Sequence, residues 1–192
     1  MLKDIFVSEV RVKILKIMLL NPTKQYHVRA LVREVGTEIN AIRRELFRLT
    51  NIGLLRRRQS SNRIYYTVDT NSLYYPELLS LVAKETHIGA DIINNAKYLG
   101  NIKYVVLSRA YLRGRVSTVL DVDLFIVGSV NLEVLEKIVK AEQIRIGRDF
   151  NYSVMGEEEF IFRKRRNDQF IAKVLSQSRT MLIGDEEELC VL

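Results

Sequence analysis

The residues from Gln25 to Thr67 constrain the fold of this chain more than any other stretch. Apolar residues at 28, 31, 32 and 35 recur at the spacing of one helical face, which predicts an amphipathic helix over 26–35. Gly36 tolerates a positive φ and favours a turn at the end of that helix. Thr37 is the expected N-cap of a second helix. The expected buried side of this second helix consists of Ile39, Ile42, Leu46 and Leu49.

A β-hairpin is expected directly after the second helix. Ile52–Leu55 closes the helix and starts a strand, three arginines and a polar tip follow, and 63–67 is the expected returning strand. Ser8 is the expected cap of an earlier helix over 9–20 that supplies the third side of the core. This order of elements resembles a winged helix-turn-helix DNA-binding domain. The resemblance implies double-stranded DNA as partner, with helix 37–51 in the major groove and wing 55–67 on the backbone or minor groove.

The candidate nucleic-acid-binding residues lie on the expected outer face of the second helix and along the wing. Asn40 suits an adenine edge and Arg44 a guanine edge, whereas the remaining arginines suit phosphate. An alternative interpretation is that the arginines pair with Glu38 or Glu45 and only keep the surface hydrated. The full candidate set is Thr37, Asn40, Ala41, Arg43, Arg44, Arg48, Arg56, Arg57, Arg58, Asn62 and Arg63.

The net charge of +7 is confined to the first half of the sequence. Residues 1–87 hold 15 Lys and Arg against 8 Asp and Glu, whereas residues 88–192 hold 15 of each kind. The excess positive charge therefore coincides with the helix-turn-helix pattern. This coincidence favours a polyanionic partner for the N-terminal half.

Composition excludes several other classes of protein. The longest apolar runs are four or five residues, such as Ile17–Leu20, so we expect no membrane span. The N-terminus carries no signal-peptide pattern. The single cysteine, Cys190, excludes an intrachain disulfide framework and a cysteine-based metal cluster. We therefore expect a cytoplasmic protein.

Three segments are expected along the chain: a winged helix over 1–75, a linker helix over 76–100 and a second domain over 101–192. The linker pattern is mostly helical, with Gly89 as the expected break, and a homodimer contact could lie there. The second domain alternates strands at 104–107, 120–127, 150–155 and 181–183 with helices at 131–143, 157–162 and 167–176. The chain is therefore predicted to be a two-domain α+β protein whose second domain is of the α/β type.

A short motif in the second domain is a candidate metal- and nucleotide-binding site. Ala110–Gly114, a loop and then Asp121-Val122-Asp123 resemble the nucleotidyltransferase superfamily, in which a strand, Gly-Ser, Arg-Gly and a second strand with Asp-x-Asp follow in this order. The resemblance implies Mg²⁺ on a bound nucleotide, held by Asp121 and Asp123 from one face of the second strand. The alternative interpretation is that both aspartates are solvated or ion-paired at a strand end.

The motif departs from the superfamily pattern at two places. Alignment on Arg113-Gly114 puts Arg109-Ala110 where Gly-Ser is expected, and Ala110 lacks the hydroxyl. The third carboxylate position falls on Asn151, although Asp149 lies two residues away. An amide lacks the charge that a metal pair needs. We therefore predict no catalytic residues and a nucleotidyltransferase-like domain that is inactive.

The whole chain resembles a family of prokaryotic regulators that join a winged helix to a degenerate nucleotidyltransferase domain; segments at 75–78, 155–160 and 181–189 extend the resemblance. It implies a sequence-specific DNA-binding transcriptional regulator, whose C-terminal domain serves sensing or oligomerisation through a small-molecule or protein partner. One alternative is an active Mg²⁺-dependent nucleotidyltransferase that modifies a small molecule, RNA or protein. The other is an antitoxin-like protein-interaction module. Mg²⁺ and a nucleotide are the cofactors that the motif suggests.

Overall fold

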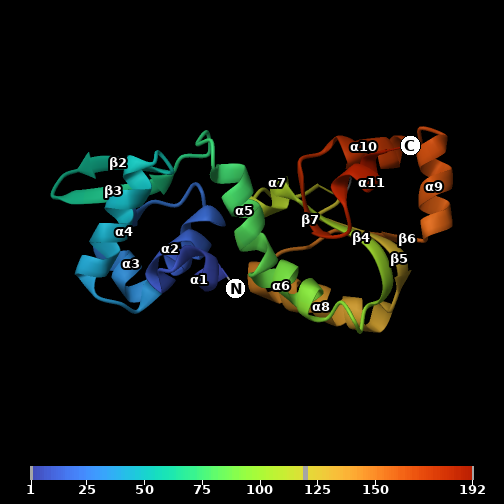
Figure 1. The fold of residues 1–192 in the computed structure, drawn as a ribbon, viewed down its shortest axis with the longest axis horizontal. Helices are drawn as coiled ribbons and strands as arrows, with labels where there is room; N and C mark the ends of the chain where they lie inside the picture. Colours follow the sequence, from blue (N-terminus) through green and yellow to red (C-terminus); the bar gives the residue numbers. More distant parts are fainter. Residues whose placement is uncertain (1, 119–120, 192) are drawn as a thin grey trace. The chain divides into compact units, whose positions relative to one another are not determined.

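The computed structural model describes residues 2–118 and 121–191, and the chain divides into two compact units, Met1–Val82 and Ala83–Leu192 (Figure 1). Helices and strands occur in both units, so the prediction of a two-domain α+β fold is confirmed. Within the described ranges, every helix is too short or too polar to cross a lipid bilayer. Leu120, the first residue of one expected strand, lies outside the described residues.

The N-terminal unit consists of helices followed by a small sheet. Ser8 caps α2 as predicted, because its side chain accepts a hydrogen bond from the Arg11 backbone N–H. Buried side chains of the second, third and fourth helices form the core, as the periodicity predicts. The elements are α1 (Leu2–Phe6), α2 (Glu9–Leu19), β1 (Tyr26–His27), α3 (Val28–Val35), α4 (Ile39–Asn51), β2 (Leu55–Ser60), β3 (Arg63–Val68) and α5 (Tyr75–Lys84).

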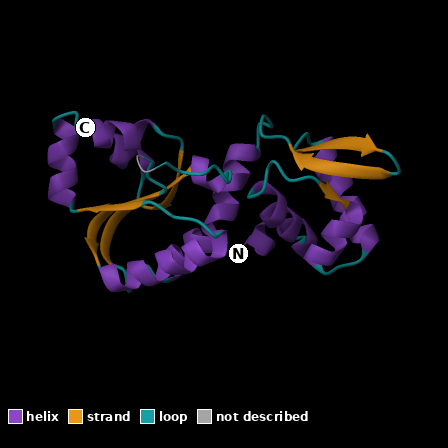
Figure 2. Ribbon diagram, turned by 180° about the vertical axis from the view of Figure 1, so that it is seen from behind, coloured by secondary structure: helices purple, strands orange, loops and turns teal. Residues whose placement is uncertain are grey.

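The sheet of this unit has the strand order β1-β3-β2, and all its pairs are antiparallel (Figure 2). The sequence pattern placed residue 26 in a helix, but α3 begins at Val28 and Tyr26 pairs with Tyr66 instead. The reason is a cap: His27 Nδ1 accepts a hydrogen bond from the Ala30 backbone N–H. Gly36 ends the helix at a φ of 70°, as expected for a left-handed cap.

The expected linker helix is two helices, α5 and α6 (His87–Asn94). The break lies at Glu85 and Thr86, and the expectation of a break at Gly89 is wrong. Gly89 lies inside α6, where a Cβ atom would stand 2.0 Å from the Ala83 carbonyl oxygen. The glycine therefore permits close backbone packing rather than a turn.

The C-terminal unit is a four-stranded sheet with helices along the chain between its strands. Its strand order is β6-β5-β4-β7, in which β5 and β6 are parallel and the other pairs are antiparallel. After α6 the elements are β4 (Gly100–Ser108), α7 (Arg109–Leu112), β5 (Leu124–Val130), α8 (Leu132–Ile146), β6 (Tyr152–Met155), α9 (Glu157–Arg165), α10 (Gln169–Ser176), β7 (Arg179–Ile183) and α11 (Glu186–Cys190).

Both faces of this sheet are buried in its two central strands. Alternate residues of β4 and β5, such as Tyr104 and Phe125, pack into one cluster with Phe160 of α9, Ile171 of α10 and Leu189 of α11. The residues between them on β4 and β5 are buried as well. Because strand neighbours point to opposite faces, continuous apolar runs are the expected sequence of such strands. Helices α6 and α8 contact each other (Figure 1).

Candidate functional site

The outer face of α4 carries the first group of candidate residues. Asn40, Arg43, Arg44 and Arg48 are exposed, whereas Thr37 and Ala41 are half-buried. Thr37 is not the N-cap that the sequence predicted. Glu38 takes that place, because its carbonyl oxygen accepts the first hydrogen bond of the helix, from the Ile42 N–H.

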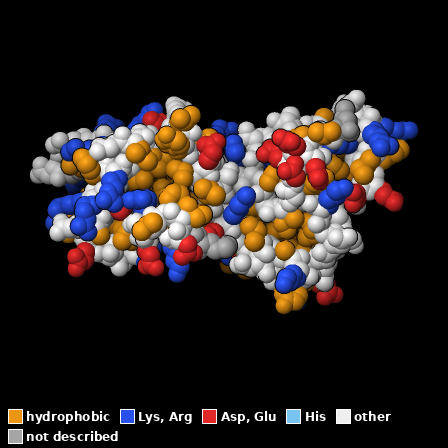
Figure 3. Space-filling model, viewed as in Figure 1, with side chains coloured by type: hydrophobic (Ala, Val, Ile, Leu, Met, Phe, Trp, Pro, Cys, Tyr) orange, Lys and Arg blue, Asp and Glu red, His pale blue; other side chains and the backbone are white. Residues whose placement is uncertain are grey.

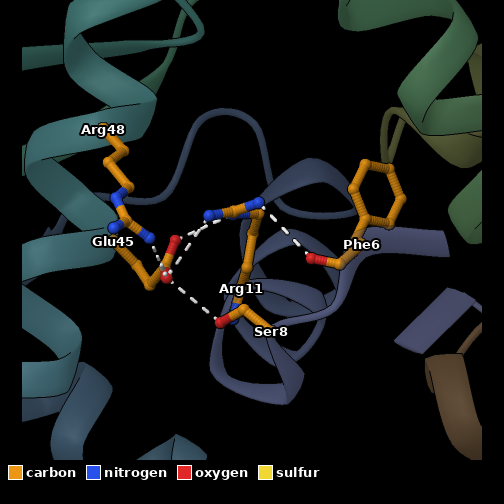
Figure 4. A network of polar contacts seen from close by, with 5 residues as sticks. All are labelled: Phe6, Ser8, Arg11, Glu45 and Arg48. Carbon is orange, nitrogen blue, oxygen red and sulfur yellow. Dashed lines mark hydrogen bonds and ion pairs between the residues drawn. The ribbon is translucent and has the colours of Figure 1, made fainter. Parts of the chain in front are cut away.

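A buried carboxylate fixes α4 against α2 (Figure 4). Glu45 is 5% exposed and accepts hydrogen bonds from Ser8 Oγ at 3.0 Å, Arg11 Nε at 2.8 Å and Arg48 Nη1 at 3.2 Å. Arg11 also reaches the Phe6 carbonyl oxygen at 3.4 Å. Charged groups are seldom buried unless paired, so this network orients the helix. The sequence interpretation paired Glu45 with an arginine at the surface. The pairing with Arg48 is confirmed, but Glu45 is buried and not at the surface.

The wing carries the second group. Strand β2 runs through Ser60, so the turn to β3 contains only Ser61 and Asn62, with Ser61 at a φ of 50°. Arg56 forms an ion pair with Asp69 at 2.8 Å, and this hydrogen bond lowers the pKa of the Asp69 carboxyl. The other wing candidates, Arg57, Arg58, Asn62 and Arg63, are exposed.

Five of these arginines have no ion pair anywhere in residues 2–118 and 121–191. They are Arg43, Arg44, Arg57, Arg58 and Arg63. The surface-pairing alternative accounts for Arg48 and Arg56 alone. On the face drawn in Figure 3, Lys and Arg side chains gather over the end of the N-terminal unit that carries α3 and α4. The surface therefore presents positive charge that the protein itself leaves uncompensated.

The motif of the second domain surrounds a cavity of about 340 Å³. Strand β4 ends at Ser108 and α7 starts at the next residue, with Ser108 Oγ accepting a hydrogen bond from the Ala110 N–H at 3.2 Å. The sequence alignment put Arg109-Ala110 at the Gly-Ser position, and in the structure these two residues follow β4 directly, in the first turn of α7. The neighbouring hydroxyl belongs to Ser108, the last residue of the strand. The cavity lining comprises Ser108, Arg109, Ala110, Arg113, Arg115, Val116, Ser117, Asp121, Asp123, Gln177 and Ser178.

The two aspartates line this cavity but precede the strand, because β5 begins at Leu124. The expectation that they project from one face of a strand is therefore wrong. Asp123 is 2% exposed and accepts hydrogen bonds from the Ser117 hydroxyl and the Asn151 backbone N–H. Asp121 accepts from the Thr118 N–H and hydroxyl, and Lys173 lies 3.4 Å from its other oxygen.

These hydrogen bonds hold the pKa of Asp121 below its usual value, with Thr118 contributing most. Asn151 stands at the third carboxylate position, and its side-chain amide donates to the Thr118 carbonyl oxygen at 2.7 Å. Asp149 is exposed and does not line the cavity. Among the described residues, no three Asp, Glu, His or Cys side chains come together in a group that could hold a metal ion. The donor set therefore does not fit a metal held by three carboxylates.

Helix α7 is anchored to α8 by a buried pair. The Tyr111 hydroxyl donates a hydrogen bond to Glu142 of α8, which is fully buried and also paired with Arg145. Burial opposes the ionisation of Glu142, but hydrogen bonds from His87 and Tyr111 outweigh it and lower the pKa of its carboxyl. Burial raises the pKa of Tyr111 above its usual value. The anchor thus positions the segment that carries Arg109 and Arg113.

Comparison with curated proteins identifies a relative from Methanocaldococcus jannaschii named "Putative protein adenylyltransferase". The two sequences are 31% identical over 86 residues, which cover 84% of the relative and 45% of this chain. This chain belongs to the family of that adenylyltransferase. The nucleotidyltransferase-like part of the sequence resemblance is therefore established. No family model matches the chain, and no solved structure matches it.

Sequence reasoning missed Ser108, Ser117 and Arg115 of the cavity. Ser108 directly precedes the motif residues, but only the extent of β4 shows that it is the last residue of the strand. Ser117 and Arg115 lie in the loop whose path no periodicity predicts. From the sequence, the two aspartates stay candidate metal ligands, and three arginines line the same cavity.

Proposed function

We propose that this protein is a sequence-specific DNA-binding transcriptional regulator, with α4 in the major groove and the β2–β3 wing on the backbone or minor groove. The observation that carries the proposal is the set of five exposed arginines on these two elements that form no ion pair among the described residues. Duplex DNA supplies the dense negative charge that such a surface complements.

The order of elements supports the same proposal. A helix whose outer face is free of core residues follows a tight turn at Gly36, and a two-stranded wing follows the helix. Asn40 and Arg44 lie in its first two turns, where base-edge contacts are expected. Arg57 and Arg58 are neighbours on β2 and therefore point to opposite faces of the wing. We further propose a homodimer on paired half-sites, which analytical ultracentrifugation with and without DNA would test.

The test is a salt-dependent binding titration of the full chain on a pool of genomic fragments. We expect selection of a few fragments, and a plot of log K against log salt whose slope falls by about 0.9 for each phosphate contact removed. Arg57→Ala should flatten that slope and weaken binding to all fragments alike. Arg44→Ala should instead cost about 1–3 kcal/mol at one base pair.

Lys140→Ala is the matched control for Arg57→Ala, because it removes one exposed positive charge from α8 of the other unit. It should leave the salt slope unchanged. Weak binding without selection, or equal effects of Arg57→Ala and Lys140→Ala, would count against DNA as the partner.

A second candidate function is nucleotidyl transfer. It is supported by the relative's name and by the cavity, which brings Ser108, three arginines and both aspartates together. Under this alternative the chain would move the nucleotidyl group of a nucleoside triphosphate to a protein, with pyrophosphate as the leaving group. The donor set argues against it, because Asn151 stands at the third carboxylate position.

The test of the second candidate is incubation of the full chain with α-labelled ATP, Mg²⁺ and a cell extract. Label on any protein that is lost in both Asp121→Ala and Asp123→Ala would favour transfer. Absence of label, together with selective DNA binding, is the result expected from the regulator. A stoichiometric second protein that co-purifies and abolishes DNA binding would instead favour the interaction-module alternative.

A further inference from the structure

Phe47 is a large apolar side chain in the middle of the outer face of α4. It is 66% exposed. Asn40 lies seven residues before Phe47, Arg44 lies three residues before it and Asn51 lies four residues after it. All three side chains are exposed. Because residues three, four and seven apart lie above one another on a helix, these four side chains form one straight stripe.

The core of the unit does not account for this phenylalanine. The buried residues of α4 are Ile42, Glu45, Leu46 and Leu49, which lie on the opposite side of the helix. A residue at position 47 points about half a turn away from the middle of that group. Single exposed apolar side chains are common on protein surfaces, so the groups around Phe47 decide whether it faces a ligand.

The charge around Phe47 identifies the kind of ligand. Arg43 and Arg44 lie one turn before it on the helix, and neither has an ion pair among the described residues. Arg48 flanks it on the other side and is held by Glu45 at 3.2 Å. An apolar protein surface would leave these guanidinium groups uncompensated. A polyanion with apolar groups between its charges would satisfy both.

We propose that Phe47 determines sequence specificity by packing against the 5-methyl group of a thymine in the major groove. The thymine methyl is the apolar group that a base pair presents there, and phenylalanine is among the side chains that contact it. The inference rests on the proposed DNA-binding function. It adds a base-reading residue that lies beyond Asn40 and Arg44.

The helix geometry limits where the thymine stands. Phe47 is three residues beyond Arg44, a rise of about 4.5 Å along the helix axis. Successive bases on one strand are separated by about 3.4 Å. The thymine is therefore expected one or two base pairs from the base that Arg44 contacts.

The test replaces each thymine of the selected fragment with deoxyuridine, which lacks only the methyl group. For the wild-type chain, one such replacement near the Arg44 contact should lower affinity about fourfold, the effect of one methyl group withdrawn from a buried contact. Phe47→Ala should lower affinity for the thymine fragment by at least the same factor. It should then bind the thymine and deoxyuridine fragments equally.

Phe162→Ala is the matched control, since Phe162 of α9 is 57% exposed and belongs to the other unit. It should retain the fourfold discrimination. Because Phe47 is exposed, its variant is expected to keep the melting temperature of the wild type, and this measurement separates lost recognition from lost folding.

The outcomes of the two proposals are distinguishable. If the wild-type chain selects no fragment, the DNA-binding function itself fails. If it selects fragments but no deoxyuridine replacement near the Arg44 contact changes its affinity, the inference about Phe47 is overturned and the DNA-binding function stands. Discrimination that persists in Phe47→Ala would assign the methyl contact to another residue and would overturn the inference as well.

Discussion

Replacing Glu45 with glutamine tests whether the buried carboxylate holds the recognition helix in place. The substitution keeps the shape of the side chain but removes the charge that Ser8, Arg11 and Arg48 share. Arg11 is 26% exposed and contacts Glu45 at 2.8 Å, whereas Arg48 is 61% exposed. The Arg11 contact therefore dominates the expected effect.

The magnitude follows from these exposures. A hydrogen bond to a charged group contributes about 1.5–3 kcal/mol, and an exposed ion pair on one helix about 0.3–0.5 kcal/mol. We expect the free energy of opening of α4 to fall by about 2–3 kcal/mol. Every 1.4 kcal/mol is tenfold in an equilibrium constant, so the amides should exchange about 30- to 150-fold faster.

The assay is native-state hydrogen exchange of the Leu46 and Leu49 amides in the full chain, because both residues are buried in α4. Glu34→Gln is the matched control. Glu34 is 39% exposed and pairs with exposed Lys24 at 3.6 Å, so its loss should change exchange less than threefold. Equal acceleration in both variants would refute the argument that the buried network holds α4.

Three further changes test the two units. Tyr111→Phe removes a donor to buried Glu142 and should lower the urea-unfolding free energy of its unit by about 1–2 kcal/mol at pH 7. Because the folded pKa of Glu142 is lowered, its contribution is present above the unfolded value of about 4.3 and is lost as the pH falls through the folded pKa, so the two unfolding curves should converge in acid. Gly36→Ala places a residue with a Cβ at a backbone φ of 70°. It should lower the free energy of unfolding by about 1 kcal/mol and the melting temperature by about 4–8 °C. Asp123→Asn replaces a carboxylate that accepts two hydrogen bonds with an amide. It should lower the unfolding free energy in the same urea assay by about 1–3 kcal/mol, more than Asp121→Asn at the more exposed carboxylate.

Helices α2, α3 and α4 of the N-terminal unit were predictable because their buried residues recur every three or four positions, whereas the five-residue α1 was not predicted. The two-residue strand β1 was not predictable, because two residues are too few to show an alternating pattern. Only the pairing of Tyr26 with Tyr66, forty residues away, makes this segment a strand. Long-range pairing of this kind leaves no local sequence signal.

The burial of Glu45 was hidden for a related reason. Its position between Ile42 and Leu46 lies on the buried side of the helical wheel, but a charge there is ordinarily read as a surface group. Arg11, which compensates it, lies 34 residues earlier in α2. The partner therefore depends on tertiary packing and not on spacing within α4.

In the second unit, the order of the strands and of helices α8 to α10 was predictable from buried apolar runs, but helices α7 and α11 were not predicted. The alignment depended on Arg113-Gly114, and the four-residue helix α7 between the strand and that pair was too short to predict. The structure puts Ser108 at the end of the strand and Arg109 directly after it. Because the sequence pattern ended the strand at residue 107, it did not bring Ser108 into the motif.

The two candidate sites differ in how their cations are compensated. Five arginines of α4 and the wing have no ion pair among the described residues, whereas the cavity places its arginines beside Asp121 and Asp123. Each phosphate that an uncompensated arginine neutralises releases a counterion, so DNA binding should weaken steeply with salt. A nucleotide in the cavity would meet carboxylates along with cations, and its affinity should depend on salt much less. Parallel salt titrations of a selected DNA fragment and of ATP would therefore separate the two sites, and equal slopes would contradict the argument that uncompensated arginines form the DNA-binding surface.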